Sequence, residues 1–111
     1  MTLMFMSITE MPMILRVYGT AKVIHPRHAE WNMLIGMFPS LAGSRQIFDM
    51  TIDSVATSCG SGVPVMTVTE IRGVHDLVPF YEAMTHTEQH DYWNRKNTTS
   101  IDGLPTKIFT D

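Results

Sequence analysis

An α+β fold, comprising a partial β-barrel with flanking helices, is predicted from the order of periodic segments along the chain. Residues 14–24 and 44–56 alternate apolar and polar side chains with the period of two that is typical of strands. One helical pattern separates these segments, and the remaining helical patterns follow the last strand pattern. The length of 111 residues suits one domain, expected over residues 1–111.

The core strands are expected within about residues 2–71. Residues 2–8 form a short apolar run that indicates a buried strand. Residues 14–24 place small and apolar side chains on one face and polar ones, Arg16 among them, on the other, which suits a curved barrel sheet. In residues 44–56, the side chains of Phe48, Met50 and Ile52 share the expected buried face. Residues 65–71, rich in β-branched side chains, predict a further strand.

A helix is expected between the strand segments, because Pro26 suits a first helical position and an apolar stripe follows it. The stripe consists of Trp31, Leu34, Ile35 and Phe38.

Further helices and a tail are expected over about residues 76–111. Asp76 is a candidate N-cap that would place Pro79 in the first turn. Thr85 and Glu88 match a capping box that opens a helix ending near Lys96. Residues 100–111 lack periodicity and are expected to pack as an extended arm.

Composition favours an oligomer. Only 17% of the residues are charged, whereas 44% are hydrophobic and ten are Met, so some apolar surface is expected to lie against a partner. A formal charge of −3 without a basic stripe argues against nucleic acid, and no stretch is long enough for a membrane-spanning helix. The lone Cys59 excludes an intramolecular disulfide and favours the cytoplasm.

Several residues admit both a functional and a structural interpretation. The loop at Gly60–Gly62 is expected to be a tight turn rather than a phosphate cradle, and Cys59 a small packed residue rather than a nucleophile. His86 and His90 share a helix face as a zinc pair would, but no third ligand is evident, so no metal site is predicted.

The basic residues on the strands offer a second pair of alternatives. Arg16, Lys22 and Arg45 either meet an anionic ligand, such as a flavin phosphate, or pair with carboxylates on a solvated face. Tyr92 and Trp93 either stack on a ring system or anchor their helix to the sheet. Spacing alone identifies no catalytic residue.

Three segments resemble the pyridoxamine 5′-phosphate oxidase-like family of FMN-binding split barrels. Residues 2–25 resemble its central hairpin, residues 43–66 its strand and S-C-G-Y-G-V-P loop, and residues 92–105 its C-terminal helix and S-I-D-G-L-P tail. The resemblance implies the C-terminal portion of a split barrel that dimerises and binds FMN between subunits, with flavin redox chemistry supplied by the cofactor. Arg16, Ser44 and Arg45 are the residues it places on the flavin side.

Two departures from the family pattern remove groups near the expected groove. Met13 stands where the family usually has Arg, and Ser61 replaces the loop Tyr. The upstream strands of the family are also expected to be missing, as in a chain truncated at Met1. Two functions follow: part of an FMN-dependent oxidoreductase-like homodimer, or a non-catalytic dimerisation scaffold that has lost the cofactor site. Haem or a deazaflavin is a weaker third expectation for the same fold.

Overall fold

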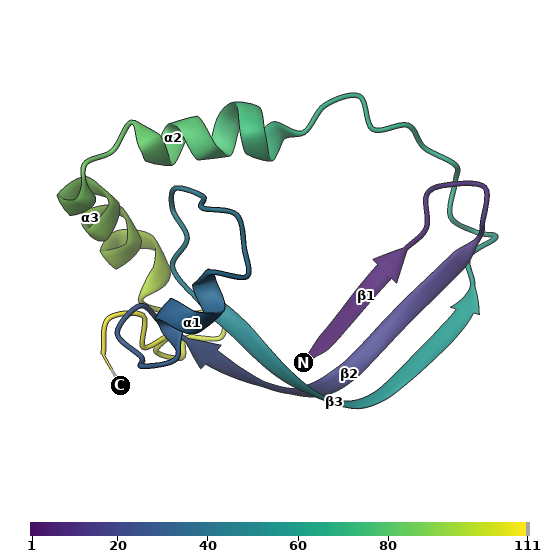
Figure 1. Ribbon diagram of the computed structural model, residues 1–111, viewed down its shortest axis with the longest axis horizontal. Coiled ribbons are helices and arrows are strands. Elements are labelled where there is room, and N and C mark those ends of the chain that lie inside the picture. The colour runs from purple at the N-terminus through teal and green to yellow at the C-terminus, as the bar shows by residue number, and fades with distance from the viewer. Residues whose placement is uncertain (111) are drawn as a thin grey trace. The chain divides into compact units, whose positions relative to one another are not determined.

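Three antiparallel strands and a set of short helices make up the protein, described over residues 1–110 by a computed structural model (Figure 1). The α+β class is as predicted. The chain divides into two compact units: a sheet unit, Met1–Ile24 with Gln46–Glu70, and a helical unit, His25–Arg45 with Ile71–Asp111. None of the helices in residues 1–110 combines the length and hydrophobicity needed to cross a lipid bilayer.

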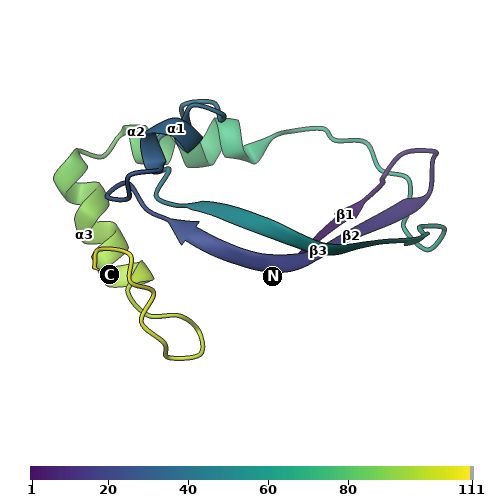
Figure 2. The ribbon, with the colours of Figure 1, turned by 60° about the horizontal axis from the view of Figure 1, so that its bottom comes forward.

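The sheet unit has the strand order β1-β2-β3. β1 (Thr2–Met6) pairs with β2 (Met13–Ile24), which in turn pairs along its whole length with β3 (Ile47–Cys59). Figure 2 shows β2 and β3 running side by side as a long curved ribbon. The hairpin predicted over residues 2–24 is confirmed, and β3 extends beyond the predicted end at residue 56.

A β-bulge keeps the apolar side chains of β3 on one face. Tyr18 pairs with Ser54 and Gly19 pairs with Ile52, so Asp53 is the extra residue on β3. Without it, the period of two would turn Val55 to the face opposite Ile52; with it, both residues share a face. At this point the β2 backbone approaches β3 so closely that a Cβ on Gly19 would overlap the Thr51 carbonyl oxygen.

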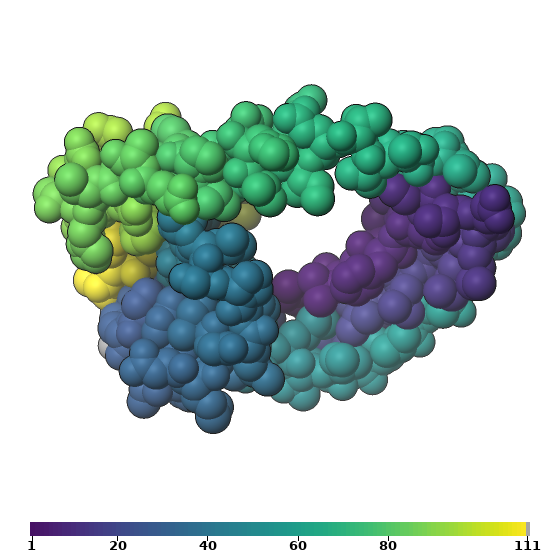
Figure 3. Space-filling view, turned by 45° about the horizontal axis from the view of Figure 1, so that its top comes forward, coloured from purple at the N-terminus to yellow at the C-terminus, as the bar shows by residue number. Residues whose placement is uncertain are grey.

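The register gives the sheet one apolar face and a second, called the polar face, that carries Arg16 and Asp49 together with Met4 and Met6. The apolar face is as predicted for residues 14–24 and for Phe48, Met50 and Ile52, and β1 adds Leu3 and Phe5 to it. The burial predicted for residues 2–8 and for this face of β3 is wrong, because Phe5 is 55% exposed and Ile52 is 59% exposed. Figure 3 shows the residues of β1, in purple, uncovered by β2 and β3 on the face in view. The sheet therefore presents apolar surface of the kind that marks interaction sites.

The helical unit contains α1 (Trp31–Ile35), the π-helical turn η1 (Gly73–Leu77), α2 (Val78–Glu82) and α3 (His86–Asn97). The capping box predicted at the start of α3 is confirmed: Thr85 Oγ1 accepts from the Glu88 N–H at 3.3 Å, and a Glu88 carboxylate oxygen accepts from the Thr85 N–H at 2.8 Å. Pro79 lies in the first turn of α2, as predicted.

Three sequence predictions are wrong. The helix expected from Pro26 begins only at Trp31, and it ends before Phe38, because Gly36 is its C-cap. Residues 65–71 form no strand and are exposed; the Met66 N–H donates to the carbonyl of Ile8, in the turn between β1 and β2, at 2.9 Å. Asp76 caps no helix, since it lies inside η1 and Leu77 is the N-cap of α2.

Aromatic side chains hold α2 and α3 together. The ring of Tyr92 on α3 lies 5.5 Å from Phe80 and 6.1 Å from Tyr81, both edge to face. The Gln89 side-chain amide also donates to the Tyr81 carbonyl at 2.9 Å. Tyr81 is buried, and Gly43, with φ of +83°, lies so close to its ring that a Cβ would overlap it. Tyr92 thus anchors its helix to α2.

Candidate functional site

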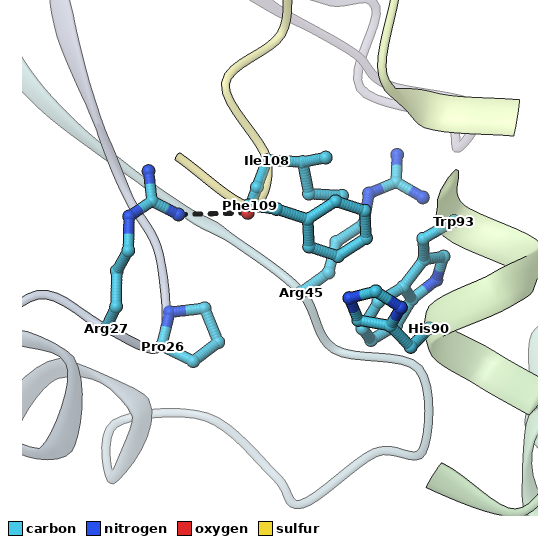
Figure 4. A pocket seen from close by; sticks show the side chains of 7 residues that line it. All are labelled: Pro26, Arg27, Arg45, His90, Trp93, Ile108 and Phe109. Carbon is cyan, nitrogen blue, oxygen red and sulfur yellow. Dashed lines mark hydrogen bonds between the residues drawn. The ribbon is translucent and has the colours of Figure 1, made fainter. Parts of the chain in front are cut away.

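A pocket of about 220 Å³ lies within the helical unit. Its walls come from the segment before α1, the loop that leads into β3, helix α3 and the C-terminal tail (Figure 4). The lining residues are Pro26, Arg27, Arg45, His90, Trp93, Ile108 and Phe109. No acidic side chain is among them, so the charged groups that line the pocket are cationic.

Arg27 fastens the C-terminal tail to this unit. Its guanidinium donates to the carbonyl oxygens of Lys107 and Ile108, each at 2.9 Å, and of Thr110 at 2.7 Å. Ile108 is buried, although no periodic pattern predicts burial at this position. The tail, predicted as an extended arm, instead turns back through a bridge between Thr99 and Pro105 and forms a wall of the pocket; Asp111 lies outside the described residues.

The imidazole of His90 and the ring of Phe109 stack across the pocket wall. Their centroids are 4.2 Å apart and their planes differ by 28°. Lys107, just before the tail segment, has a φ of 54°, a left-handed conformation that is uncommon outside glycine. This turn and the Arg27 bonds bring Phe109 to α3, so the wall depends on tail and helix together.

Two polar groups of the pocket retain hydrogen-bonding capacity. The indole Nε1 of Trp93 is buried and has no hydrogen-bond partner within residues 1–110. Arg45 is half-buried, and its Nη1 donates to Asn97 Oδ1 at 3.4 Å, a long bond that uses one of the five guanidinium N–H groups. Figure 4 shows the guanidinium groups of Arg45 and Arg27 at opposite sides of Phe109.

The three residues that the sequence placed on the flavin side have different surroundings. Arg45 lines the pocket, and Ser44 precedes it, with its hydroxyl donating to the Leu41 carbonyl at 2.8 Å in a turn. Arg16 belongs to the sheet unit, where its Nη1 donates to the Ser58 hydroxyl at 2.9 Å on the polar face. The structure therefore brings Ser44 and Arg45 together and describes Arg16 within a separate unit.

Cys59 is exposed, so the prediction that it packs as a small buried residue is wrong. Its Sγ lies 2.8 Å from the Ser61 hydroxyl and accepts from the Ser61 N–H at 3.4 Å. The hydrogen bond with the Ser61 side chain, and to a smaller extent that from the Ser61 backbone, lowers the pKa of the Cys59 thiol below its ordinary value. The loop itself is a turn, as predicted, with the Val63 N–H donating to the Gly60 carbonyl at 2.8 Å.

Within residues 1–110, no three His, Cys, Asp or Glu side chains lie close enough together to hold a metal ion. His86 is exposed at the start of α3, whereas its i+4 neighbour His90 stacks on Phe109. In helix α3 the imidazole of His90 therefore serves as an aromatic packing surface for Phe109.

Sequence reasoning missed the contribution of Arg27, Ile108 and Phe109 to the pocket. The available signal was the adjacent apolar pair Ile108–Phe109 near the end of the tail, which indicates that the tail packs against the protein. Nothing in the spacing connects Arg27 with carbonyl groups about eighty residues away, because backbone acceptors leave no trace in a sequence.

Comparison with known proteins gives one informative similarity. The chain is 30% identical, over 118 aligned residues, to the pyridoxamine 5′-phosphate oxidase family protein ustO of Aspergillus flavus. The alignment covers 94% of this chain and 47% of that protein, so the chain spans about half the length of the curated relative it matches. No protein-family model matches the chain, and no solved structure matches it.

The similarity supports the pyridoxamine 5′-phosphate oxidase family. It agrees with the family resemblance of the hairpin, loop and tail segments, and the curved antiparallel sheet is consistent with part of a split barrel. The pocket in the helical unit contains the guanidinium groups of Arg27 and Arg45, and the sheet unit carries that of Arg16.

Proposed function

We propose that this chain works in the cytoplasm as part of an FMN-dependent, oxidoreductase-like protein of the pyridoxamine 5′-phosphate oxidase family. It corresponds to the C-terminal portion of an FMN-binding split barrel and acts as a homodimer. The observation that carries this proposal is the 30% identity to a protein of that family over nearly the whole chain, together with the barrel-like sheet.

Dimerisation is proposed because the sheet unit leaves apolar surface open. Phe48 is 50% exposed and Val55 is 57% exposed on the same face. β1, at the edge of the sheet, has no charged residue, proline or bulge of the kind that protects natural edge strands. A second copy would bury this face.

The pocket of the helical unit is too small for a whole flavin nucleotide. The pocket of about 220 Å³ is smaller than the roughly 300 Å³ at which ligand pockets of drug-like size begin, so it admits only part of a flavin nucleotide. Arg16 and Arg45 offer guanidinium groups suited to phosphate, and each belongs to a different unit. We propose that Arg16, Ser44 and Arg45 each contribute to flavin binding in the homodimer.

The deciding experiment is an FMN titration of the purified chain, followed by flavin fluorescence and by the visible spectrum. The expected result is saturable uptake approaching one flavin per chain, weakened by Arg16→Ala, Ser44→Ala and Arg45→Ala. Arg95→Ala, an exposed arginine on α3, is the matched control and should retain the flavin. Absence of uptake at high micromolar FMN would rule out the flavoprotein; uptake unchanged in all three variants would rule out these residues.

A non-catalytic dimerisation unit is the second candidate function. It is favoured by the small volume of the pocket and by Met13 and Ser61, which replace an Arg and a Tyr of the family pattern. This function predicts a dimer that takes up no FMN, so the same titration, combined with a mass measurement in solution, separates the two candidates.

A further inference from the structure

We propose that the pocket of the helical unit is a binding site for a small aromatic carboxylate. This proposal does not depend on the flavin, because it rests on residues of one unit of one chain. The pocket combines a cation with spare donors, a buried N–H without a partner, and aromatic walls.

The first argument is the unpartnered indole N–H of Trp93. A buried donor without an acceptor costs free energy, which a hydrogen bond to an incoming acceptor would recover. Trp93 lines the pocket and its indole supplies a donor and no acceptor, but Nε1 is enclosed, so a ligand reaches this N–H only when neighbouring side chains shift. The group that this position lacks is therefore a hydrogen-bond acceptor, such as a carboxylate oxygen.

The second argument is the charge of Arg45. Within residues 1–110 its guanidinium makes one long hydrogen bond, to the neutral amide of Asn97, and no carboxylate pairs with it. The other ionisable side chains that line the pocket are Arg27 and His90, neither of which is acidic. An anion entering the pocket meets only neutral or positive groups, and a carboxylate matches the planar donor geometry of arginine.

The third argument is the shape and chemistry of the walls. The stacked pair of His90 and Phe109 and the indole of Trp93 offer flat aromatic surfaces, and Pro26 and Ile108 add apolar contact. A volume of about 220 Å³ suits a single ring with one short substituent. Aliphatic anions would use the charge without the ring surfaces, so an aromatic acid makes fuller use of the site.

The test is a titration of the full chain with 4-fluorobenzoate, observed through the fluorine NMR signal of the probe, with 4-fluorobenzyl alcohol as its neutral counterpart. We expect saturable binding of the acid and binding of the alcohol that is about tenfold weaker. Arg45→Gln should weaken acid binding about tenfold, and Trp93→Phe, which keeps a ring but removes the N–H, about threefold or more.

Two further variants serve as controls. Arg95→Gln removes an exposed arginine of the same helix and should leave the affinity within about twofold of the original. Arg45→Lys keeps the charge but loses the planar donor geometry of the guanidinium, so it should bind the acid with intermediate affinity. This variant tests the site independently if Trp93→Phe does not fold. The proposal is overturned if the acid shows no saturable binding below about 10 mM, if the alcohol binds equally well, or if Arg45→Gln has no effect.

Discussion

The sheet unit and the helical unit achieve order in different ways. In the sheet unit, one continuous backbone ladder joins β2 to β3, yet much of its apolar face stays exposed. In the helical unit, the regular elements are short, and order comes from individual side chains: the Arg27 bonds to the tail, the capping box and the aromatic contacts of α2 with α3. The comparison teaches that strand pairing can order a sheet while its apolar face stays exposed, whereas local side-chain contacts order the helical unit.

The largest expected effect tests the close backbone approach in the sheet unit. Gly19→Ala would place a Cβ against the Thr51 carbonyl oxygen, which is backbone of the paired strand and cannot rotate away. We expect a loss of unfolding free energy of about 3 kcal/mol or more, measured by urea denaturation followed by circular dichroism. Gly62→Ala is the matched control, because open space surrounds Gly62; its cost should stay below about 0.5 kcal/mol. Equal costs would show that the β2–β3 approach is looser than described.

The next effect tests packing in the helical unit. Gly43 and Gly103 both have positive φ, 83° and 78°, but only Gly43 lies against the Tyr81 ring. Gly103→Ala should cost about 1 kcal/mol from backbone conformation alone, and Gly43→Ala about 1–2 kcal/mol more from the overlap. The same denaturation measurement checks both variants. A Gly43→Ala variant no less stable than Gly103→Ala would contradict the packing of Tyr81.

A third effect concerns the tail. Arg27→Gln removes the donors to three backbone carbonyls, and the segment 107–110 should become less protected by about 1–2 kcal/mol. Hydrogen exchange, read by mass spectrometry on peptides from the tail and from β2, measures this directly. Faster exchange confined to the tail is expected, and Arg95→Gln should leave both peptides unchanged. If Arg27→Gln speeds hydrogen exchange no more in the tail peptide than in the β2 peptide, Arg27 does not hold the tail in place.

The smallest effect is the pH dependence of the α3 start. The N–H of Thr85, and then its hydroxyl, hold the pKa of the Glu88 carboxyl below its ordinary value. Since the folded-state pKa is the lower one, the stabilisation is present above the unfolded-state pKa of about 4.3 and is lost as the pH falls through the folded-state value. Thr85→Ala should cost about 1 kcal/mol at neutral pH.

Helix content as a function of pH provides the measurement. Glu88→Gln cannot titrate, so its stability should change less with pH below about 5 than that of the original chain. If both chains lose stability in parallel down to pH 3, the capping carboxylate is not responsible for the acid sensitivity of the helical unit.

The regular elements were predictable where the pattern is local. The alternation in residues 14–24 and the Thr85–Glu88 pair determine β2 and the start of α3 through their immediate neighbours. The strand expected over residues 65–71 failed because β-branched side chains favour a strand only where another strand pairs with it, and these residues have no such partner in the described chain. Asp76 failed as a cap because η1 continues through it.

The candidate site was predictable only in part. Arg45 was identified from its place at the start of a strand, and Trp93 from its aromatic ring. Phe109 and the tail that Arg27 binds complete the pocket around Arg45 and Trp93. Their placement depends on the reversal of the chain after α3 and on backbone carbonyl acceptors, and neither has a sequence signature. The bulge at Asp53 was likewise hidden, since it changes which residues face each other but leaves composition unaltered.

Sedimentation equilibrium over a range of concentrations tests the central claim most directly, which is that a second copy covers the open face of the sheet. The account predicts twice the 12.6 kDa chain mass, and a monomer for Ile52→Asp, which puts a charge on the apolar face. Thr51→Asp, on the polar face, should remain dimeric. A chain that stays monomeric at all concentrations and melts sharply when dilute would contradict the account.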